Sequence, residues 1–201
     1  MALTKKIAMQ GDVFEGISSV FAIAGGITTT AGTSGDAGKQ VANLTSLDIL
    51  EFPVSDDSGF NFDSGQPSIE RFKVKGLNAD WVNTFTPGDG EITLEIPCHN
   101  TNILELVYGK TSQNVKFTVA SGLMGTNTTL AGKGYSFDQK AIYLGLLILN
   151  DTEDKLLYIK KAKFMAQTIF DGSNKPLCVV LTGSISAAGD SDAFGILEPS
   201  D

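Results

Sequence analysis

Histidine and cysteine, the residues that most often carry catalysis or bind transition metals, are nearly missing from this sequence. It has one histidine and two cysteines in 201 residues. Two cysteines are too few for the disulfide framework of a small secreted scaffold. A zinc site would need further Cys or His ligands that the chain lacks. We therefore expect no disulfide scaffold, no metal centre and no cofactor.

The only neighbours that resemble a nucleophile and its base are Cys98 and His99. Adjacent residues on a strand point to opposite faces of the sheet, so these two side chains are badly placed to share a proton. Each cysteine, Cys98 and Cys178, lies within or beside an apolar run, which favours a buried thiol. The pair does not predict catalysis.

Paired carboxylates occur twice, as Asp56 with Asp57 and as Glu91 with Glu95. Two carboxylates are the usual equipment of a glycoside hydrolase. Here the first pair lies in a turn-like segment, and the second lies on the polar side of an alternating strand pattern, where solvated charge is the default. The sequence therefore predicts a protein that is not an enzyme.

Basic residues and long apolar runs are also scarce. Fifteen Lys and Arg stand against 23 Asp and Glu, for a net charge of −8. Sequence-independent binding to nucleic acid depends on Lys and Arg, so we do not expect the chain to bind DNA tightly.

No stretch approaches the roughly 18 apolar residues of a membrane span, and the first ten residues lack the apolar core of a signal peptide. We expect a soluble protein without a membrane span.

Glycine, serine and threonine are what the sequence has in plenty. The chain has 22 Gly, and only 19% of its residues are charged, whereas exposed helix faces are normally built from long charged side chains. At this length a single core is sufficient. The expected fold is mainly β: a single domain over residues 1–201 with antiparallel sheets in a β-sandwich or barrel-like arrangement.

Strand patterns recur along the chain. Apolar and polar residues alternate at Ile92, Leu94 and Ile96 against Glu91, Thr93 and Glu95, which is the two-residue period of a half-buried strand. Residues 141–149 are apolar throughout and indicate a central strand that is covered on both faces. Further strands are expected around residues 70–75, 115–119, 156–170 and 177–187, the last of these completing a meander with its neighbours.

One short helix is expected at about residues 101–108. Asn102 stands three residues before Glu105, which is the spacing of a capping box, and Gly109 provides a stop. A helix of about two turns is marginal alone in water, so it must pack on a sheet. We place Leu104 on its buried face.

Two segments are predicted to be extended loops, at residues 25–40 and 55–66. Both are rich in Gly, Ser, Thr and Asp and have little apolar surface with which to order themselves. They are the candidate assembly elements. Within them the side chains suited to a neighbouring subunit are Thr28, Thr29, Thr30, Phe60 and Phe62. The alternative for the two phenylalanines is that they fold back onto their own core.

Two stretches give the sequence a family resemblance. One is GDGEITLEIP at residues 88–97, which leads into TNILELVYG at 101–109, and the other is LTGSISAAGD at 181–190, followed by FGIL at 194–197. In these stretches the chain resembles phage tail tube proteins, whose tube fold is shared with the inner-tube protein of type VI secretion systems. The resemblance implies a structural virion protein without catalytic residues.

The same resemblance implies partners and a place of action. It implies a homo-oligomeric ring, a hexamer, that stacks into a tube in the virion tail, joins other tail proteins, and is assembled in the host cytoplasm. The tube would serve as a conduit through which DNA passes without tight binding. An acidic lumen is a tendency of this family, and the net charge of −8 agrees with it.

Glu91 and Glu95 are the candidates for lumen-facing residues, because they share one face of a strand about 13 Å apart. The alternative is that they face bulk solvent outside the tube. Two other functions stay open: a capsid decoration or head-stabilising protein, which would share the acidic, β-rich character, and a carbohydrate-binding, adhesin-like module. The latter would need exposed aromatics, for which Trp81 near Phe85 is the only cue.

Overall fold

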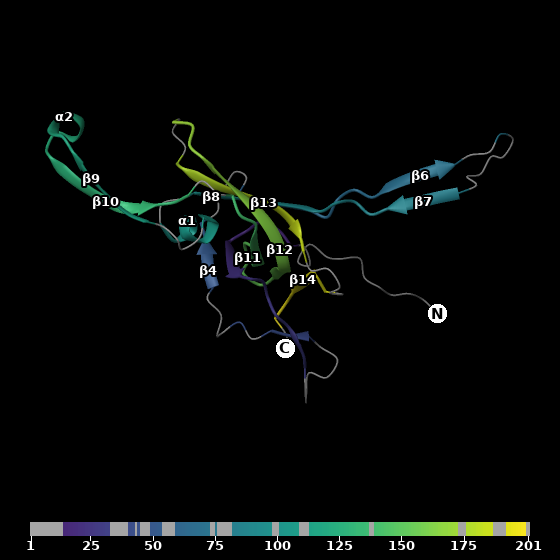
Figure 1. Ribbon diagram of the computed structural model, residues 1–201. Coiled ribbons are helices and arrows are strands. Elements are labelled where there is room, and N and C mark those ends of the chain that lie inside the picture. The colour runs from purple at the N-terminus through teal and green to yellow at the C-terminus, as the bar shows by residue number, and fades with distance from the viewer. Residues whose placement is uncertain are drawn as a thin grey trace. The chain divides into compact units, whose positions relative to one another are not determined.

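The computed structural model of the protein is shown in Figure 1. It describes residues 14–32, 40–42, 44, 49–53, 59–72, 75, 82–97, 101–108, 113–136, 139–172, 176–186 and 192–199. The chain divides into two compact units. Unit 1 comprises residues 1–54, 143–162 and 185–201, and unit 2 comprises 55–142 and 163–184. The prediction of a single domain stays a prediction.

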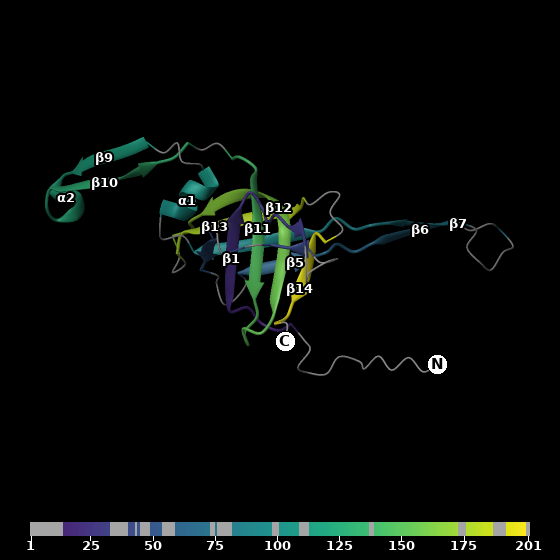
Figure 2. The ribbon, with the colours of Figure 1, turned by 90° about the horizontal axis from the view of Figure 1, so that it is seen from below.

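The strands of unit 1 form the order β4-β1-β11-β12, and β14 also pairs with β12. The pairs β1–β11, β1–β4 and β12–β14 are antiparallel. Figure 2 shows β1, β11 and β12 side by side. The strands are β1 (Ser19–Ala24), β4 (Ile49–Phe52), β11 (Ile142–Leu149), β12 (Leu156–Ile169) and β14 (Phe194–Leu197), together with the small hairpin β2 (Thr30–Ala31) and β3 (Gln40–Val41).

Strand β11 is the central strand that the apolar run 141–149 predicts. It lies between β1 and β12, and its side chains from Leu144 to Ile148 are buried. Gly145 lets the segment after β1 pass close to it. A Cβ at that position would lie 2.6 Å from the Ile27 side chain and 3.1 Å from the Lys160 carbonyl oxygen. A larger residue would therefore push this layer apart.

The turn between β11 and β12 is organised by one buried amide, that of Asn150. Its Nδ2 donates to Thr152 Oγ1 and to Asp154 Oδ1, each at 2.7 Å. Its Oδ1 accepts from the backbone N–H groups of Asp154 at 3.1 Å and Lys155 at 2.9 Å. The side chain is 2% exposed, so these bonds have little competition from water.

Strand β14 is bracketed by two ion pairs with buried lysines. Lys160 Nζ lies 2.9 Å from Asp192 Oδ1, and Lys155 Nζ lies 3.3 Å from Glu198 Oε1. Both lysines are 6% exposed. A buried charge that loses its partner is strongly destabilising, so the two pairs fix the residues on either side of β14. Between them, Leu197 lies opposite Leu156 and Gly195 opposite Tyr158.

Unit 2 continues from the second half of β12 with the order β12-β13-β8-β5. Strands β8 (Glu91–Pro97) and β13 (Cys178–Ile185) are antiparallel, as are β8 and β5 (Phe60–Asp63). The alternation predicted for residues 91–96 is confirmed: the inward side chains are all completely buried. They are Ile92, Leu94 and Ile96 from β8, with Val179 and Leu181 from β13.

Two stretches expected as loops contain strands. Phe60 and Phe62 belong to β5, where they lie opposite Leu94 and Ile92 and are half-buried on the core side of the sheet. The expectation of a loop at 55–66 is therefore wrong for residues 60–63; residues 55–58 lie outside the described part. The alternating pattern FNFD is a strand pattern that the Ser, Asp and Gly around it conceal. Within 25–40, Thr30–Ala31 pairs with Gln40–Val41.

Two further hairpins pair, in the described part of the chain, only within themselves. One is β6 (Ser68–Phe72) with β7 (Val82–Thr86), and the other is β9 (Gln113–Val119) with β10 (Thr128–Gly134). A single helical turn, α2 (Ser121–Met124), connects β9 to β10. The side chains of β6 are exposed throughout, and those of β10 are exposed except at its two ends.

Helix α1 (Thr101–Tyr108) lies where the sequence predicts it. Asn102 is inside the helix, which begins at Thr101, two residues earlier than a capping box with Asn102 as its cap requires. Ile103 and Val107 are buried, whereas Leu104 is half-buried, so the buried face is one residue away from the expected one. At the end of the helix the Tyr108 hydroxyl hydrogen-bonds Thr168 Oγ1 at 2.5 Å.

These elements confirm a mainly β fold of antiparallel sheets with a short packed helix. In the part of the chain that the structure describes, the path of the main sheet ends at β4 and at β5 and does not close into a barrel. No helix among the described residues is long and apolar enough to cross a membrane.

Replacing Asn150 by Ala is expected to lower the free energy of unfolding by about 1–3 kcal/mol, because two backbone N–H groups lose their acceptor in a turn that water reaches poorly. Urea denaturation followed by circular dichroism measures the change. Asp151→Asn, an exposed neighbour in the same turn, is the control and should stay within about 0.5 kcal/mol of the wild type. An equal effect of both variants would contradict the role given to the Asn150 amide.

In α1, Ile103→Ala is expected to destabilise unit 2 by about 2–5 kcal/mol, since it removes a side chain that is 2% exposed. Leu104→Ala should cost less than half as much, because Leu104 is only half-buried. The two variants are matched in composition and differ by one position on the helix. Thermal and urea unfolding distinguish them, and the reverse ranking would place the buried face at Leu104.

Candidate functional site

The most regular polar surface of unit 2 is the side of its sheet opposite the core. Because side chains alternate along a strand, residues between the buried positions of β8 project to this side. The strand register adds the facing residues of β5 and β13. We call this surface the acidic face; it consists of Asn61, Asp63, Glu91, Thr93, Glu95, Val180 and Thr182.

Three of these seven residues are acidic and none is basic. Asp63 lies opposite Glu91, and both are exposed, whereas Glu95 is half-buried. Carboxylates held on a regular strand surface produce a negative potential that repels phosphate groups. The structure thus places Glu91 and Glu95 on one exposed face of one strand. That this face lines a lumen stays a prediction.

Glycines at the end of β5 and before β8 bring the two strands together at this face. Gly65 has φ +83°, a conformation that favours glycine. A Cβ at Gly88 would lie 2.4 Å from the Gly65 carbonyl carbon, so the two backbones pass at a distance that only glycine permits. The Gly65 N–H donates to Asp63 Oδ1 at 2.8 Å. Close packing of these two backbone segments therefore accounts for the glycine at position 88 in the motif Gly88-Asp89-Gly90.

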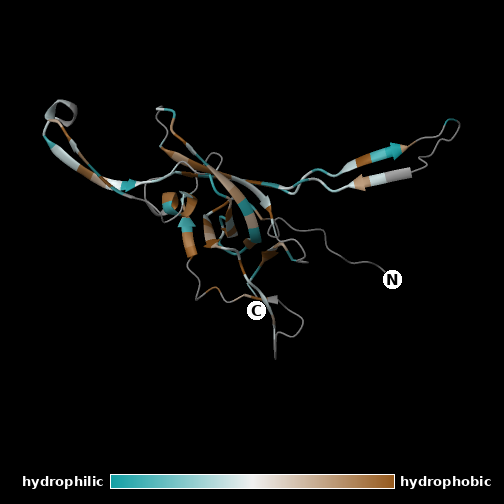
Figure 3. Ribbon diagram, viewed as in Figure 1, coloured by the Kyte–Doolittle hydropathy of each residue, from teal (hydrophilic) through white to brown (hydrophobic). Residues whose placement is uncertain are grey.

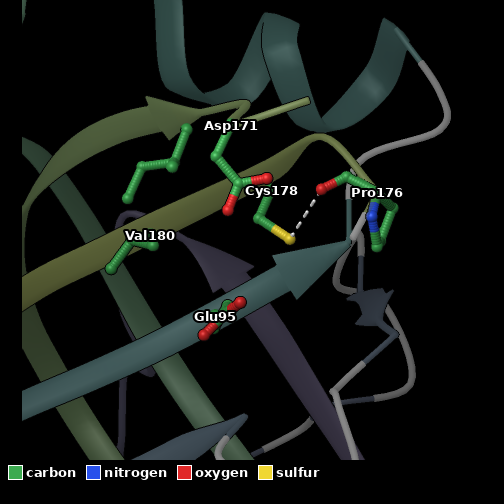
Figure 4. A pocket seen from close by; sticks show the side chains of 6 residues that line it. Glu95, Asp171, Pro176, Cys178 and Val180 are labelled. Atoms are coloured by element: carbon green, nitrogen blue, oxygen red, sulfur yellow. Dashed lines mark hydrogen bonds between the residues drawn. The ribbon is translucent and has the colours of Figure 1, made fainter. Parts of the chain in front are cut away.

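A small hollow adjoins the acidic face. It is lined by Glu95, Ile169, Asp171, Pro176, Cys178 and Val180. Figure 4 shows the Cys178 thiol donating to the Pro176 carbonyl oxygen, at 3.3 Å. The thiol is 7% exposed, as the apolar surroundings of Cys178 predict. Among the described residues no three Asp, Glu, Cys or His side chains come close enough together to hold a metal ion.

The other candidates are either structural or outside the described residues. Cys98, His99, Asp56 and Asp57 lie outside them. Asp154, in the turn after β11, accepts hydrogen bonds from the Thr152 hydroxyl and the Asn150 amide, and these lower the pKa of its carboxyl. This carboxylate therefore serves the turn.

The predicted assembly threonines lie after β1. Thr28 is exposed, Thr29 is half-buried, and Thr30 belongs to β2. The Thr30 hydroxyl donates to the Val41 carbonyl oxygen at 3.5 Å, across the β2–β3 hairpin. Their role in assembly, like that of Phe60 and Phe62, stays a prediction.

Exposed apolar side chains on the β6–β7 and β9–β10 hairpins are not among the residues that the sequence predicts for a site. Register places Leu130 opposite Phe117, and Phe85 opposite Ile69. Phe117 and Phe85 are each 66% exposed. Figure 3 shows hydrophobic residues along both hairpins. The alternation at 115–119 predicts the apolar side of β9, but a pattern alone does not say whether that side is covered.

Comparison with known proteins gives little. No protein family model matches the chain, and no curated protein matches it. Among solved structures, a chain in the cryo-EM structure of the anti-feeding prophage (AFP) baseplate, 6-fold symmetrised, is similar with a TM-score of 0.39 and 11% identity. The match covers 96% of this chain and 98% of that chain. A likeness at this level does not establish a shared fold or function.

Proposed function

We propose that this chain is a structural subunit that assembles with copies of itself into stacked rings, forming a tail-tube conduit through which a genome passes. The partners are further copies of the chain and other tail proteins, and the place of action is the virion tail. The role is passive: no catalytic residue and no cofactor takes part in it.

The observation that carries this proposal is the exposure of the two hairpins. A two-stranded hairpin is at best marginally stable alone in water, and it needs a covering surface on an apolar face. Here Phe85 lies opposite Ile69 and Phe117 opposite Leu130, and both phenylalanines are 66% exposed; Phe72, on the other side of the β6–β7 hairpin from Phe85, is 65% exposed. Clusters of exposed large apolar side chains mark interaction sites in soluble proteins. In an assembly, other subunits cover the hairpins, and their exposed apolar side chains are then shielded from water.

The acidic face supports the conduit rather than another assembly. A wall that lets DNA slide needs a regular surface without cations, because each Lys or Arg that meets a phosphate adds affinity. The acidic face is built on strands and has no basic residue among its seven members. Ring symmetry would repeat its carboxylates as bands of negative potential. The resemblance of residues 88–97 and 181–197 to tail tube proteins points the same way.

Negative-stain electron microscopy of the concentrated, purified protein tests the proposal directly. Rings or tubes are expected, and light scattering coupled to size exclusion should show a mass that rises with concentration. Because some tube subunits polymerise only on an initiator complex, the experiment is repeated with the other tail proteins of the same particle. A monomer under both conditions would contradict the proposal. Binding only to a preformed capsid lattice would favour a decoration protein.

Reversing the charge of the acidic face should impede DNA. In particles that assemble normally, Glu91→Lys with Glu95→Lys is expected to slow genome ejection by about tenfold or more at low salt, because the new cations contact phosphates. The slowing should weaken as salt is raised. Ejection kinetics from purified particles, followed with a DNA-binding dye, measure the effect.

The matched control is Glu15→Lys with Glu51→Lys, which makes the same change in net charge on exposed residues outside the acidic face and outside the two hairpins. It is expected to leave the rate of ejection unchanged. If the Glu91 and Glu95 double variant also leaves it unchanged, these residues face away from the DNA.

A further inference from the structure

Strand β14 is paired with β12 and, in the described part of the chain, with no other strand. Figure 2 shows it beside β12, on the side away from β11. Its apolar side chains are about half in water: Phe194 is 46% exposed, Ile196 55% and Leu197 52%. In β11, by contrast, residues 144–148 are all buried. Apolar burial therefore stabilises β14 much less than it stabilises β11.

The chain on either side of β14 allows it to separate from β12 without disturbing its neighbours. The preceding strand, β13, is held independently by β8. The Ser186 N–H donates to the Lys161 carbonyl oxygen, and the Lys160 N–H donates to the Ala193 carbonyl oxygen, each at 2.9 Å. These two bonds anchor the ends of a short connection on adjacent residues of β12. A detached β14 would stay tethered near its place, and closing so short a connection costs little entropy.

Ion pairs with buried lysines supply the hold that the apolar side chains of β14 lack. Asp192 pairs with Lys160 just before the strand, and Glu198 pairs with Lys155 just after it. The lysine side chains are only 8% and 6% exposed, against 27% for Asp192 and 62% for Glu198. Removing the partner of a buried charge destabilises far more than breaking an exposed pair. The two carboxylates therefore fix both ends of β14 on unit 1.

Between these ends β14 lies directly on the Tyr158 ring. Gly195 is opposite Tyr158, and a Cβ at position 195 would lie 2.9 Å from Tyr158 Cε1 and 3.1 Å from Tyr158 Oη. Tyr158 lines a hollow in unit 1 whose wall includes Asp192 and Leu197. The ring also packs on the buried cluster that contains Ile27. The segment 192–198 therefore covers both the edge of β12 and one side of this hollow.

We propose that residues 192–198 form a strap, which opens as a unit while the rest of unit 1 stays folded, and that its two ion pairs set how often it opens. Opening leaves residues 156–159 of β12 without their partner strand and removes Asp192 and Leu197 from the wall of the hollow. An unpaired strand edge is a template for a strand of another chain, so the closed strap shields this edge. Neither self-assembly nor the passage of DNA enters into this device, which is independent of the proposed function.

Amide hydrogen exchange of the full-length protein, followed by mass spectrometry, tests the strap without any substitution. Peptides that cover residues 193–198 are expected to exchange at least about tenfold faster than peptides that cover 144–149 of β11. Equal rates would show that β14 separates only when unit 1 unfolds, which would overturn the inference.

Neutralising both carboxylates tests the role of the ion pairs. Asp192→Asn with Glu198→Gln is expected to speed exchange in 193–198 by a further tenfold, roughly, because both buried lysines lose their partners, while exchange in β11 stays within about twofold of the wild type. The control is Glu15→Gln with Glu51→Gln, which removes the same charge from exposed residues of unit 1 and should change neither rate. The inference fails if the strap is not accelerated, if β11 is accelerated equally, or if the control has the same effect.

A steric variant opens the strap and leaves every charge in place. Gly195→Val puts a branched side chain against the Tyr158 ring and is expected to speed exchange in 193–198 by about tenfold, with β11 unchanged. The control is Gly132→Val in β10, where an added Cβ meets nothing within 4 Å. This pair also decides the matter if circular dichroism shows that the neutralised variant does not fold. Equal exchange in the Gly195→Val and Gly132→Val variants would overturn the close contact and, with it, the strap.

Discussion

The apolar contact between β8 and β13 is the constraint on which the rest of unit 2 depends. Their inward side chains are completely shielded from solvent, and an antiparallel register fixes which residues of the two strands meet. Because side chains alternate, burying one side dictates the other: Glu91, Thr93 and Glu95 must then share a polar surface. A slip of one residue would bury two carboxylates, at a cost no neighbour offsets. The acidic face is thus a consequence of the core.

The sequence predicts most of what depends on local period. The strand at 91–96, the central strand at 141–149 and the helix at 101–108 all follow from spacing alone, and the structure contains each of them. The prediction of the helix's buried face is wrong by one residue, since Ile103 rather than Leu104 is buried in the core. In a helix of only eight residues the apolar pattern does not distinguish position 103 from position 104 as the buried one. Packing against the neighbouring sheet determines which side chain is buried.

What the sequence does not predict are the features set by pairing across long distances. Phe60 and Phe62 look like aromatics in a turn, because their partner β8 lies about 30 residues further on and local composition is dominated by Ser, Asp and Gly. The exposure of Phe117 is equally hidden, since alternation is the same whether the apolar side is covered by the chain's own core or by nothing. Periodicity identifies a face; it does not identify what lies against it.

Two features of the monomer have opposite effects on its association with other copies: the exposed apolar side chains of the hairpins, and the net charge of −8. The apolar faces favour association, while like charges on whole subunits oppose indiscriminate contact. Assembly is then specific only if attraction is local and repulsion is general. In the β9–β10 hairpin, Lys116 lies on the side opposite Phe117 and Leu130, so the apolar side offers attraction without a charge of its own. Local apolar contact and general electrostatic repulsion are thus separated on this hairpin, which is the arrangement that specific assembly requires.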